Sequence, residues 1–343
     1  MARLPRYNTS GDPVLNLRRF VRLFTHIQLL PVLENGEETT LIGGQAVMEG
    51  VMMRSPHSYC VAVRKPDGRI VTEESPLARI SEKYPIFKWP VLRGLGTLGG
   101  AMWLGMKALK FSAECALEGT STTSQKREKK EANPWAMAAN IVFSLAFMIV
   151  LYKFVPLYLA TLLGTHFHAV GGRFAINLMD GILRIAIFLG FIYALSRLKD
   201  MHRVFEYHGA EHRVVFNFES GQPVTVENAQ RFVTWHPRCG TSFLFVVLIV
   251  ALIGYAFLPI DNFWAKFVAR IALLPLIVGL SYEVIRFAAR KRGGLLSLLT
   301  QPGLWLQRIT TQPPSNDQTE VAIHALEHAM ALEKAQGGEL VIA

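Results

Sequence analysis

The sequence predicts a polytopic α-helical membrane protein. We expect about four transmembrane helices, an interfacial or re-entrant helix, and a small cytoplasmic α+β portion. Three observations predict this fold class. The 343 residues are 51% hydrophobic. Several apolar runs in the second half approach the roughly 20 residues that a helix needs to cross a bilayer. A shorter stretch near residue 50 has the turn residues and strand-forming residues of β structure.

Composition bounds the partners and the compartment. The formal net charge is +10, which suits a surface of anionic membrane lipids. The sequence carries no nucleic-acid-binding signature, so no nucleic acid is expected as a partner. The three cysteines, Cys60, Cys115 and Cys239, are an odd, sparse set that predicts reduced thiols. The first residues lack the apolar core of a signal peptide, so we expect the chain to start in the cytoplasm.

The N-terminal part divides into two predicted regions. Residues 1–40 form a peripheral basic amphipathic extension, which would lie on an anionic membrane surface or pack on the protein's own body. Its apolar helical face comprises Leu17, Phe20, Val21, Phe24 and Ile27. Residues 41–85 form a small β-rich cytoplasmic region, because the Pro-Asp-Gly turn at 66–68 separates two strand-like runs.

Residues 86–118 predict an interfacial or re-entrant helix. The apolar run between Arg93 and Lys107 is only about 13 residues long, which is short for a full span. Gly96 and Gly100 form a GxxxG pattern, which lets another helix, including one from a protein partner, approach closely.

Two transmembrane hairpins are expected, at residues 135–198 and 241–290, each built from two apolar runs. A charged linker at 119–134 precedes the first hairpin. The segment 199–240 between the hairpins is a predicted loop, and residues 291–343 are a predicted tail with a final helix.

Basic residues orient these hairpins. They are concentrated before the first hairpin, between the two hairpins and after the second. With an even number of spans, all three regions share the cytoplasmic side. We therefore expect a multi-pass protein of the inner membrane with both termini in the cytoplasm. Within the second apolar run, Asp180 and Arg184 are spaced to neutralise each other in part.

The chemistry-bearing motif is "HGAEH", an H-x-x-E-H pattern in the predicted 199–240 loop. On a helix, His208 and His212 lie one turn apart and can bind one metal ion, with zinc the expected metal. Glu211 is placed to take a proton from a water molecule on the metal. The pattern recurs as His324 and His328 near the end, where the helical periodicity predicts a solvated surface.

Further ligands are drawn from neighbouring segments. His236 and Cys239 have H-x-x-C spacing just before the third apolar run. Four protein ligands would make a structural site, whereas three ligands and a water would make a catalytic one. Glu283, in the fourth apolar run, is another candidate ligand because a charge there is expensive. The alternatives are an ion pair with Arg286 and extension of the side chain to the membrane surface.

Two minor candidates lie in "GGQAVMEGV". Glu49 is expected on the same strand face as Gln45. A buried carboxylate at that place would need a partner, and either a metal ion or an arginine would serve.

Five stretches together resemble the YqhQ-like family of bacterial integral membrane proteins, over roughly residues 41–330. They are "GGQAVMEGVMMRSP", "YHGAEHRVVFNFESG", "HPRCGTSFLF", "LLPLIVGLSYEVIRFA" and "PGLWLQRITTQPP". That family carries a domain of unknown function and is described as a predicted metal-dependent enzyme. The resemblance implies a membrane protein with a metal site on His208, Glu211, His212, His236, Cys239 and Glu283. It implies no defined reaction.

This sequence departs from the family pattern in two places. The N-terminal 40 residues look like an extension, and the family's closing helix typically lacks paired histidines. The second departure agrees with reading the pair His324 and His328 as coincidental.

Three functions are compatible with these features. The first is a metal-dependent hydrolase acting at the membrane surface. The second is a non-catalytic scaffold, assembly or regulatory factor, with a structural metal or none. The third, less favoured, is a transporter, because Asp180, Arg184, Arg270 and Glu283 are charges within apolar runs. The sequence shows neither an inverted repeat nor a broken-helix pair to support it.

Overall fold

The computed structural model describes six stretches of the chain, residues 42–77, 84–118, 134–167, 171–236, 239–290 and 301–336. The predicted N-terminal extension at residues 1–40 lies outside the described residues. Nearly all of the predicted linker at 119–134 does so as well.

A four-stranded antiparallel sheet confirms the predicted β structure. Its strands follow one another in the order β1 (Gly43–Val47), β2 (Gly50–Arg54), β3 (Ser58–Arg64) and β4 (Ile70–Pro76). The predicted Pro-Asp-Gly turn joins β3 to β4. Gly68 there has φ 88°, a conformation that glycine adopts without strain.

The rest of the described chain is mostly helical. Its helices are the 3-10 helix η1 (Pro85–Lys88), α3 (Leu92–Glu118), α4 (Pro134–Ile149), the π-helix η2 (Val150–Phe154), α5 (Val155–His166), α6 (Arg173–Ser196), α7 (Lys199–Glu219), α8 (Val226–Ala229), α9 (Gly240–Ala256), α10 (Phe263–Ala272), α11 (Leu274–Arg290), α12 (Gln301–Thr310) and α13 (Asn316–Ala335).

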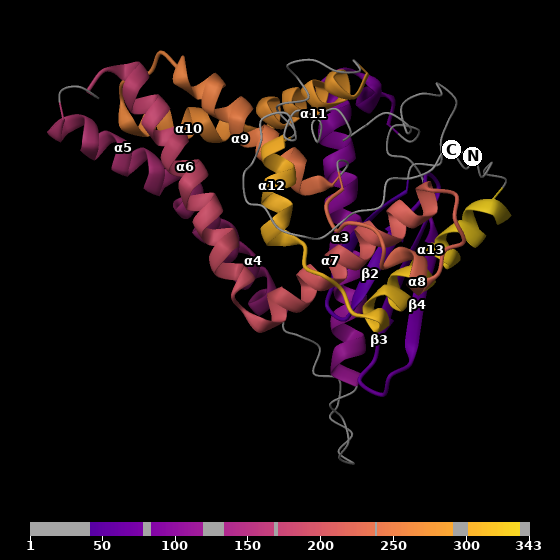
Figure 1. The fold of residues 1–343 in the computed structure, drawn as a ribbon. Coiled ribbons are helices and arrows are strands. Elements are labelled where there is room, and N and C mark those ends of the chain that lie inside the picture. Colours follow the sequence, from indigo (N-terminus) through magenta and orange to yellow (C-terminus); the bar gives the residue numbers. More distant parts are fainter. Residues whose placement is uncertain are drawn as a thin grey trace, which may run out of the picture.

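The sheet is the middle layer of a three-layer unit. Helices α7 and α13 pack on one face and α3 packs on the other (Figure 1). Strand β2 shows why both faces are covered: Val51 and Met53 are buried with α7 and α13, whereas Met52 is buried with Leu104 and Ala108 of α3. Successive side chains of a strand point to opposite faces, so a strand that is apolar throughout needs a cover on each side.

This packing explains the apolar run in α3. Instead of a break suited to a re-entrant segment, α3 is one continuous helix of 27 residues. Its second half buries Leu104, Ala108 and Cys115 against the sheet. Its first half approaches α11, where a side chain at Gly94 would meet Tyr282. Part of the apolar surface that suggested a membrane segment therefore covers one face of the sheet.

A second group of helices, α4 to α6 and α9 to α11, lies to one side of the sheet (Figure 1). Two helical stretches, Val142–His166 and Arg173–Ser196, are long and apolar enough to span a membrane. Helices α10 and α11 make a third if the pair, bent by 48°, is one span, while Gly240–Ala256 is apolar but shorter. Two or three candidate spans are consistent with membrane association. The four spans expected from the sequence are not confirmed.

Candidate metal centre

The segment expected to be a loop between hairpins is largely the 21-residue helix α7. One face of α7 is buried on the sheet and α13, through residues such as Tyr207, Ala210 and Val214. Because α7 is a regular helix across the H-x-x-E-H motif, His208 and His212 lie one turn apart. Their ring centroids are 4.5 Å from each other.

Cys239, the residue just before α9, lies beside the two histidines. Its Sγ lies 3.2 Å from Nε2 of His208 and 3.2 Å from Oγ1 of Thr241. One ligand atom from each of His208, His212 and Cys239 lies within 4.8 Å of the other two. The structure thus brings together three of the metal ligands expected from the sequence. Cys239 is also the N-cap of α9, where the helix dipole favours the negative charge of a thiolate ligand.

Backbone carbonyls fix the tautomer of both imidazoles. Nδ1 of His208 donates to the carbonyl of Thr310 at 2.7 Å, and Nδ1 of His212 donates to the carbonyl of Thr234. A carbonyl only accepts, so each Nδ1 carries the proton and each Nε2 keeps its lone pair for a ligand. This is the outer-shell arrangement typical of histidines that bind metals.

The fit of a metal ion to these residues rests on one atom in particular. Nε2 of His212 is buried and makes no hydrogen bond within the described part of the chain. Buried polar atoms are rarely left unpaired, because doing so costs about 1–3 kcal/mol. Burial also lowers the pKa of His212, with only partial opposition from Cys239. The imidazole is therefore held neutral, as a ligand must be.

A glycine inside the motif makes the outer shell possible. The chain after α12 crosses α7 at Gly209, where a Cβ would lie 2.0 Å from the carbonyl oxygen of Gln312. At the same crossing, the N–H of Gln312 donates to the carbonyl of Phe205 at 2.9 Å. This close approach lets the end of α12 present the Thr310 carbonyl to His208.

His236 lies beside the group of three and is not part of it. Its ring centroid is 5.7 Å from that of His212, and its Nε2 lies 3.4 Å from a carboxylate oxygen of Glu219. Burial lowers the pKa of His236 to about 4. His236 therefore has a carboxylate partner of its own in Glu219.

Gln307 is a supporting residue that sequence reasoning missed. The fully buried side chain accepts from the N–H of His236 at 2.6 Å and donates to its carbonyl at 2.8 Å. Both backbone groups of the loop before Cys239 are thereby fixed. The sequence signal was an uncharged glutamine inside the apolar stretch "PGLWLQRI", which a buried backbone contact explains.

Glu211, the expected proton acceptor, is 6% exposed and faces β1. The N–H of Gly44 donates to its carboxylate, and burial raises the pKa of that carboxyl group. A Cβ at Gly44 would lie 2.9 Å from Cδ of Glu211, so only glycine admits the side chain there. A carboxyl group held in such a place can exchange a proton with a neighbouring water molecule.

Glu283 lies apart from this group, at the contact of α11 with the start of α3. Its carboxylate accepts from Nε of Arg93 at 2.6 Å, from Nη2 of Arg93, and from the N–H of Val91 at 3.2 Å. Val91 has φ 68°, which is uncommon for a β-branched residue. Glu283 therefore stabilises a sharp turn, and the arginine that pairs with it is Arg93, not the alternative partner Arg286.

The two minor candidates have separate contacts. Glu49 lies in the two-residue turn between β1 and β2, not on a strand face with Gln45. Of the two partners considered for the Glu49 carboxylate, a metal ion or an arginine, the structure shows an arginine, Arg203. The hydroxyl of Tyr207 also donates to this carboxylate, at 3.3 Å. The amide of Gln45 lies where a side chain at Gly105 of α3 would be.

The second histidine pair lies elsewhere, on α13. His328 is exposed and its Nδ1 lies 3.1 Å from a carboxylate oxygen of Glu74. The predicted apolar face of that helix, Val321, Ala325, Leu326 and Met330, is buried on the sheet. These histidines thus serve as an internal control for the first pair.

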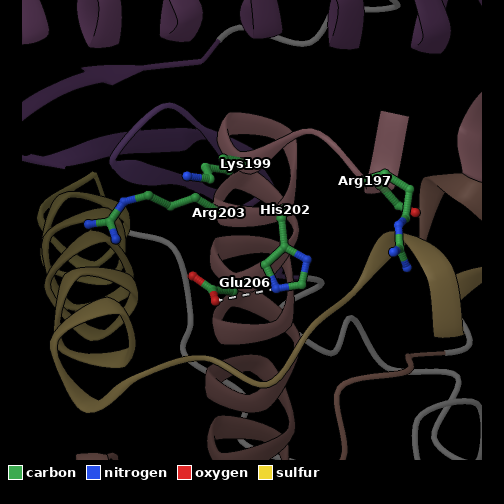
Figure 2. A pocket seen from close by; sticks show the side chains of 6 residues that line it. Arg197, Lys199, His202, Arg203 and Glu206 are labelled. Atoms are coloured by element: carbon green, nitrogen blue, oxygen red, sulfur yellow. Dashed lines mark ion pairs between the residues drawn. The ribbon is translucent and has the colours of Figure 1, made fainter. Parts of the chain in front are cut away.

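A basic pocket lies where α6 meets α7. It has a volume of about 480 Å³ and is lined by Ser196, Arg197, Lys199, His202, Arg203 and Glu206. Figure 2 shows Lys199 and Arg203 extending to one side and Arg197 lying on the other, with His202 facing Glu206 between them. Leu198 and Tyr193, which are close to these residues in sequence, are more than half exposed.

Comparison with known proteins assigns the family. The chain is 36% identical over 297 residues to "Uncharacterized protein YqhQ" of Bacillus subtilis (strain 168), which covers 85% of this chain and 92% of that protein. No solved structure matches the chain. The family model described as "Protein of unknown function (DUF1385)" matches residues 89–332, and the chain belongs to that family.

Proposed function

We propose that this chain is a metal-dependent hydrolase with a zinc ion held by His208, His212 and Cys239. The observation that carries the proposal is that one nitrogen of each histidine lies within 4.8 Å of the Cys239 thiol, and that Nε2 of His212 is buried and has no hydrogen-bond partner among the described residues. Two imidazoles and a thiolate are a donor set that zinc prefers. Three protein ligands leave one position for substrate, as in catalytic zinc sites.

Glu211 is the proposed proton carrier. A zinc ion at this position would act as a Lewis acid toward a bound carbonyl or phosphoryl group. The Glu211 carboxylate lies in the same turn of α7 as His212 and is shielded from solvent. From there it takes a proton from the attacking water and returns it to the leaving group.

The site is proposed to work at the cytoplasmic surface of the inner membrane. The distribution of basic residues supports a multi-pass topology with both termini in the cytoplasm, provided that the number of spans is even. The pocket at the α6–α7 junction supports anionic lipids as partners, because it places Arg197 and Lys199 directly after the candidate span Arg173–Ser196. Replacing both with glutamine should reduce the phosphatidylglycerol that copurifies with the protein, measured by mass spectrometry.

A non-catalytic factor is the second candidate. It is favoured by the way the centre joins segments far apart in sequence: α7, the loop before α9, and the end of α12. A metal there would hold these segments together even without turnover. The two functions differ in what Glu211 does, since a structural site needs no proton carrier.

Metal content tests the centre itself. Protein purified without chelators should contain about one zinc per chain. His208→Ala and His212→Ala should each lose most of it, whereas His328→Ala, in the second histidine pair, should keep it. A metal-free wild-type protein, or equal loss in His328→Ala, would refute the site.

Turnover separates the two functions. Wild type and Glu211→Gln should be assayed in mixed micelles against carboxyl ester, phosphodiester and amide substrates. A hydrolase loses activity in Glu211→Gln by about 100-fold or more while retaining zinc. Equal turnover by both proteins, or none by wild type across the panel, would favour the non-catalytic factor.

A further inference from the structure

Charged side chains from several apolar helices meet in one buried group. Lys153 comes from η2, Asp180 and Arg184 from α6, and Arg270 from α10. Their exposed fractions are 8%, 0%, 3% and 0%. Lys153 and Arg184 lie near the middle of the two stretches that are long enough to span a membrane. We call these four residues and Tyr255 the interhelical charge centre.

Tyr255 of α9 organises the three cations. Its ring centroid lies 5.1 Å from Nζ of Lys153, 5.1 Å from Cζ of Arg184 and 5.4 Å from Cζ of Arg270. Its hydroxyl donates to the carbonyl of Arg270 at 2.7 Å. An aromatic face attracts cations, but it carries no charge and does not neutralise them.

Asp180 supplies the negative charge among these three cations. Asp180 is ion-paired with Nη2 of Arg184 and lies 2.8 Å from Nη1 of Arg270. The two guanidinium groups against one carboxylate already leave the centre with a net positive charge, before Lys153 is counted. Neither of two neighbouring charged residues neutralises the centre. Lys266 is buried and is itself a cation, and Asp261 is paired with Arg173. Buried charges without a counter-ion are strongly destabilising.

Several polar atoms of the centre also lack hydrogen bonds. Within the described residues, Nη1 of Arg184, Nε of Arg270 and Oδ1 of Asp180 are buried and without a hydrogen-bond partner. In a membrane, the hydrocarbon chains of the lipids cannot supply the missing partners. The excess positive charge and the two unpaired guanidinium donors indicate an anionic ligand; Oδ1 of Asp180 is an acceptor and gives no support to one.

The backbone around the centre is interrupted in two helices. Lys153 belongs to a π-helical segment between α4 and α5, a distortion found mostly at functional sites. Arg270 comes just before the 48° bend between α10 and α11. Interrupted helices around a polar centre at mid-span are typical of sites that bind ions or small substrates within membranes.

We infer that the interhelical charge centre binds a small oxyanion. The carboxylate or phosphate group of this ligand would accept hydrogen bonds from Arg184, Arg270 and Lys153. Guanidinium groups match the planar geometry of such oxygens and form the strongest hydrogen bonds with them. This site is separate from the proposed zinc centre and does not depend on it. The ligand comes either from solution or from a lipid headgroup, since both present the same oxygens.

The experiment is thermal unfolding of the full chain in nanodiscs. In pure phosphatidylcholine, titration with inorganic phosphate or with acetate at constant ionic strength should raise the midpoint saturably. Lys153→Met should weaken the apparent affinity at least tenfold, because it removes one donor at the edge of the centre. Arg173→Met, which removes a paired surface cation of the same helix α6, should behave as wild type.

A second variant distinguishes a ligand site from a structural ion-pair network. Asp180→Asn removes the competing negative charge, so oxyanion binding should become tighter even if the protein is less stable without it. For a purely structural network, the variant would be destabilised to the same extent at every phosphate or acetate concentration.

Lipid-derived phosphate is tested in nanodiscs with phosphatidylglycerol and no added anion. Stabilisation there that is lost in Lys153→Met assigns the headgroup as the source. Stabilisation by phosphate or acetate in phosphatidylcholine assigns a soluble ligand. Absence of both in wild type, or an unchanged response in Lys153→Met, would overturn the inference.

Discussion

Gly209→Ala is expected to weaken the zinc centre without touching a ligand. The Cβ of alanine would lie 2.0 Å from the Gln312 carbonyl oxygen, whereas an ordinary contact begins at 3.4 Å. The difference is 1.4 Å, and it must come from movement of the crossing chain, because α7 is held on the sheet. That chain carries Thr310, two residues before Gln312.

The size of the effect follows from the His208 contact. Its Nδ1 donates to the Thr310 carbonyl at 2.7 Å, so a shift of about 1.4 Å along this direction exceeds the range of a hydrogen bond. Losing an outer-shell partner of a metal ligand weakens metal affinity about 10- to 100-fold. This corresponds to about 1.4–2.7 kcal/mol of binding free energy.

The assay is competition for zinc between the purified protein and a chromophoric chelator. Gly254→Ala is the matched control, because a Cβ at that helical glycine meets nothing within 4 Å. It should bind zinc as wild type does. If Gly209→Ala is folded and its zinc affinity stays within about twofold of wild type, the outer-shell role of Thr310 is refuted.

Three further substitutions test the assignment of supporting residues. Glu283→Gln should leave zinc content unchanged and lower the free energy of unfolding by no more than about 1 kcal/mol, because its pair with Arg93 is partly solvated; loss of zinc would return Glu283 to the ligand set. Gln307→Leu should cost about 1–3 kcal/mol in thermal unfolding, since it removes the acceptor of the buried His236 N–H, while the His236 carbonyl still accepts from the N–H of Cys239 at 3.2 Å. Gly68→Ala should cost about 1 kcal/mol in the same assay, because φ there is 88°; no change would contradict the turn geometry.

Local patterns were the predictable part of this protein. The Pro-Asp-Gly turn predicted the β3–β4 hairpin, since turn chemistry acts over a few residues. Helical spacing predicted that His208 and His212 share a face. The apolar run in α3 was ambiguous, because hydrophobicity alone does not distinguish lipid from the face of a sheet as the surface that covers it.

Residue types and short spacings are enough to predict the candidate ligands, the charge distribution and the strand–turn–strand pattern of the sheet. Which of the candidates meet depends on the tertiary structure. It joined Cys239 to the histidines, gave Glu283 to Arg93, and delivered the Thr310 carbonyl across Gly209. These contacts link residues far apart in the chain, so they depend on how α7, α9 and α12 pack and not on any local preference.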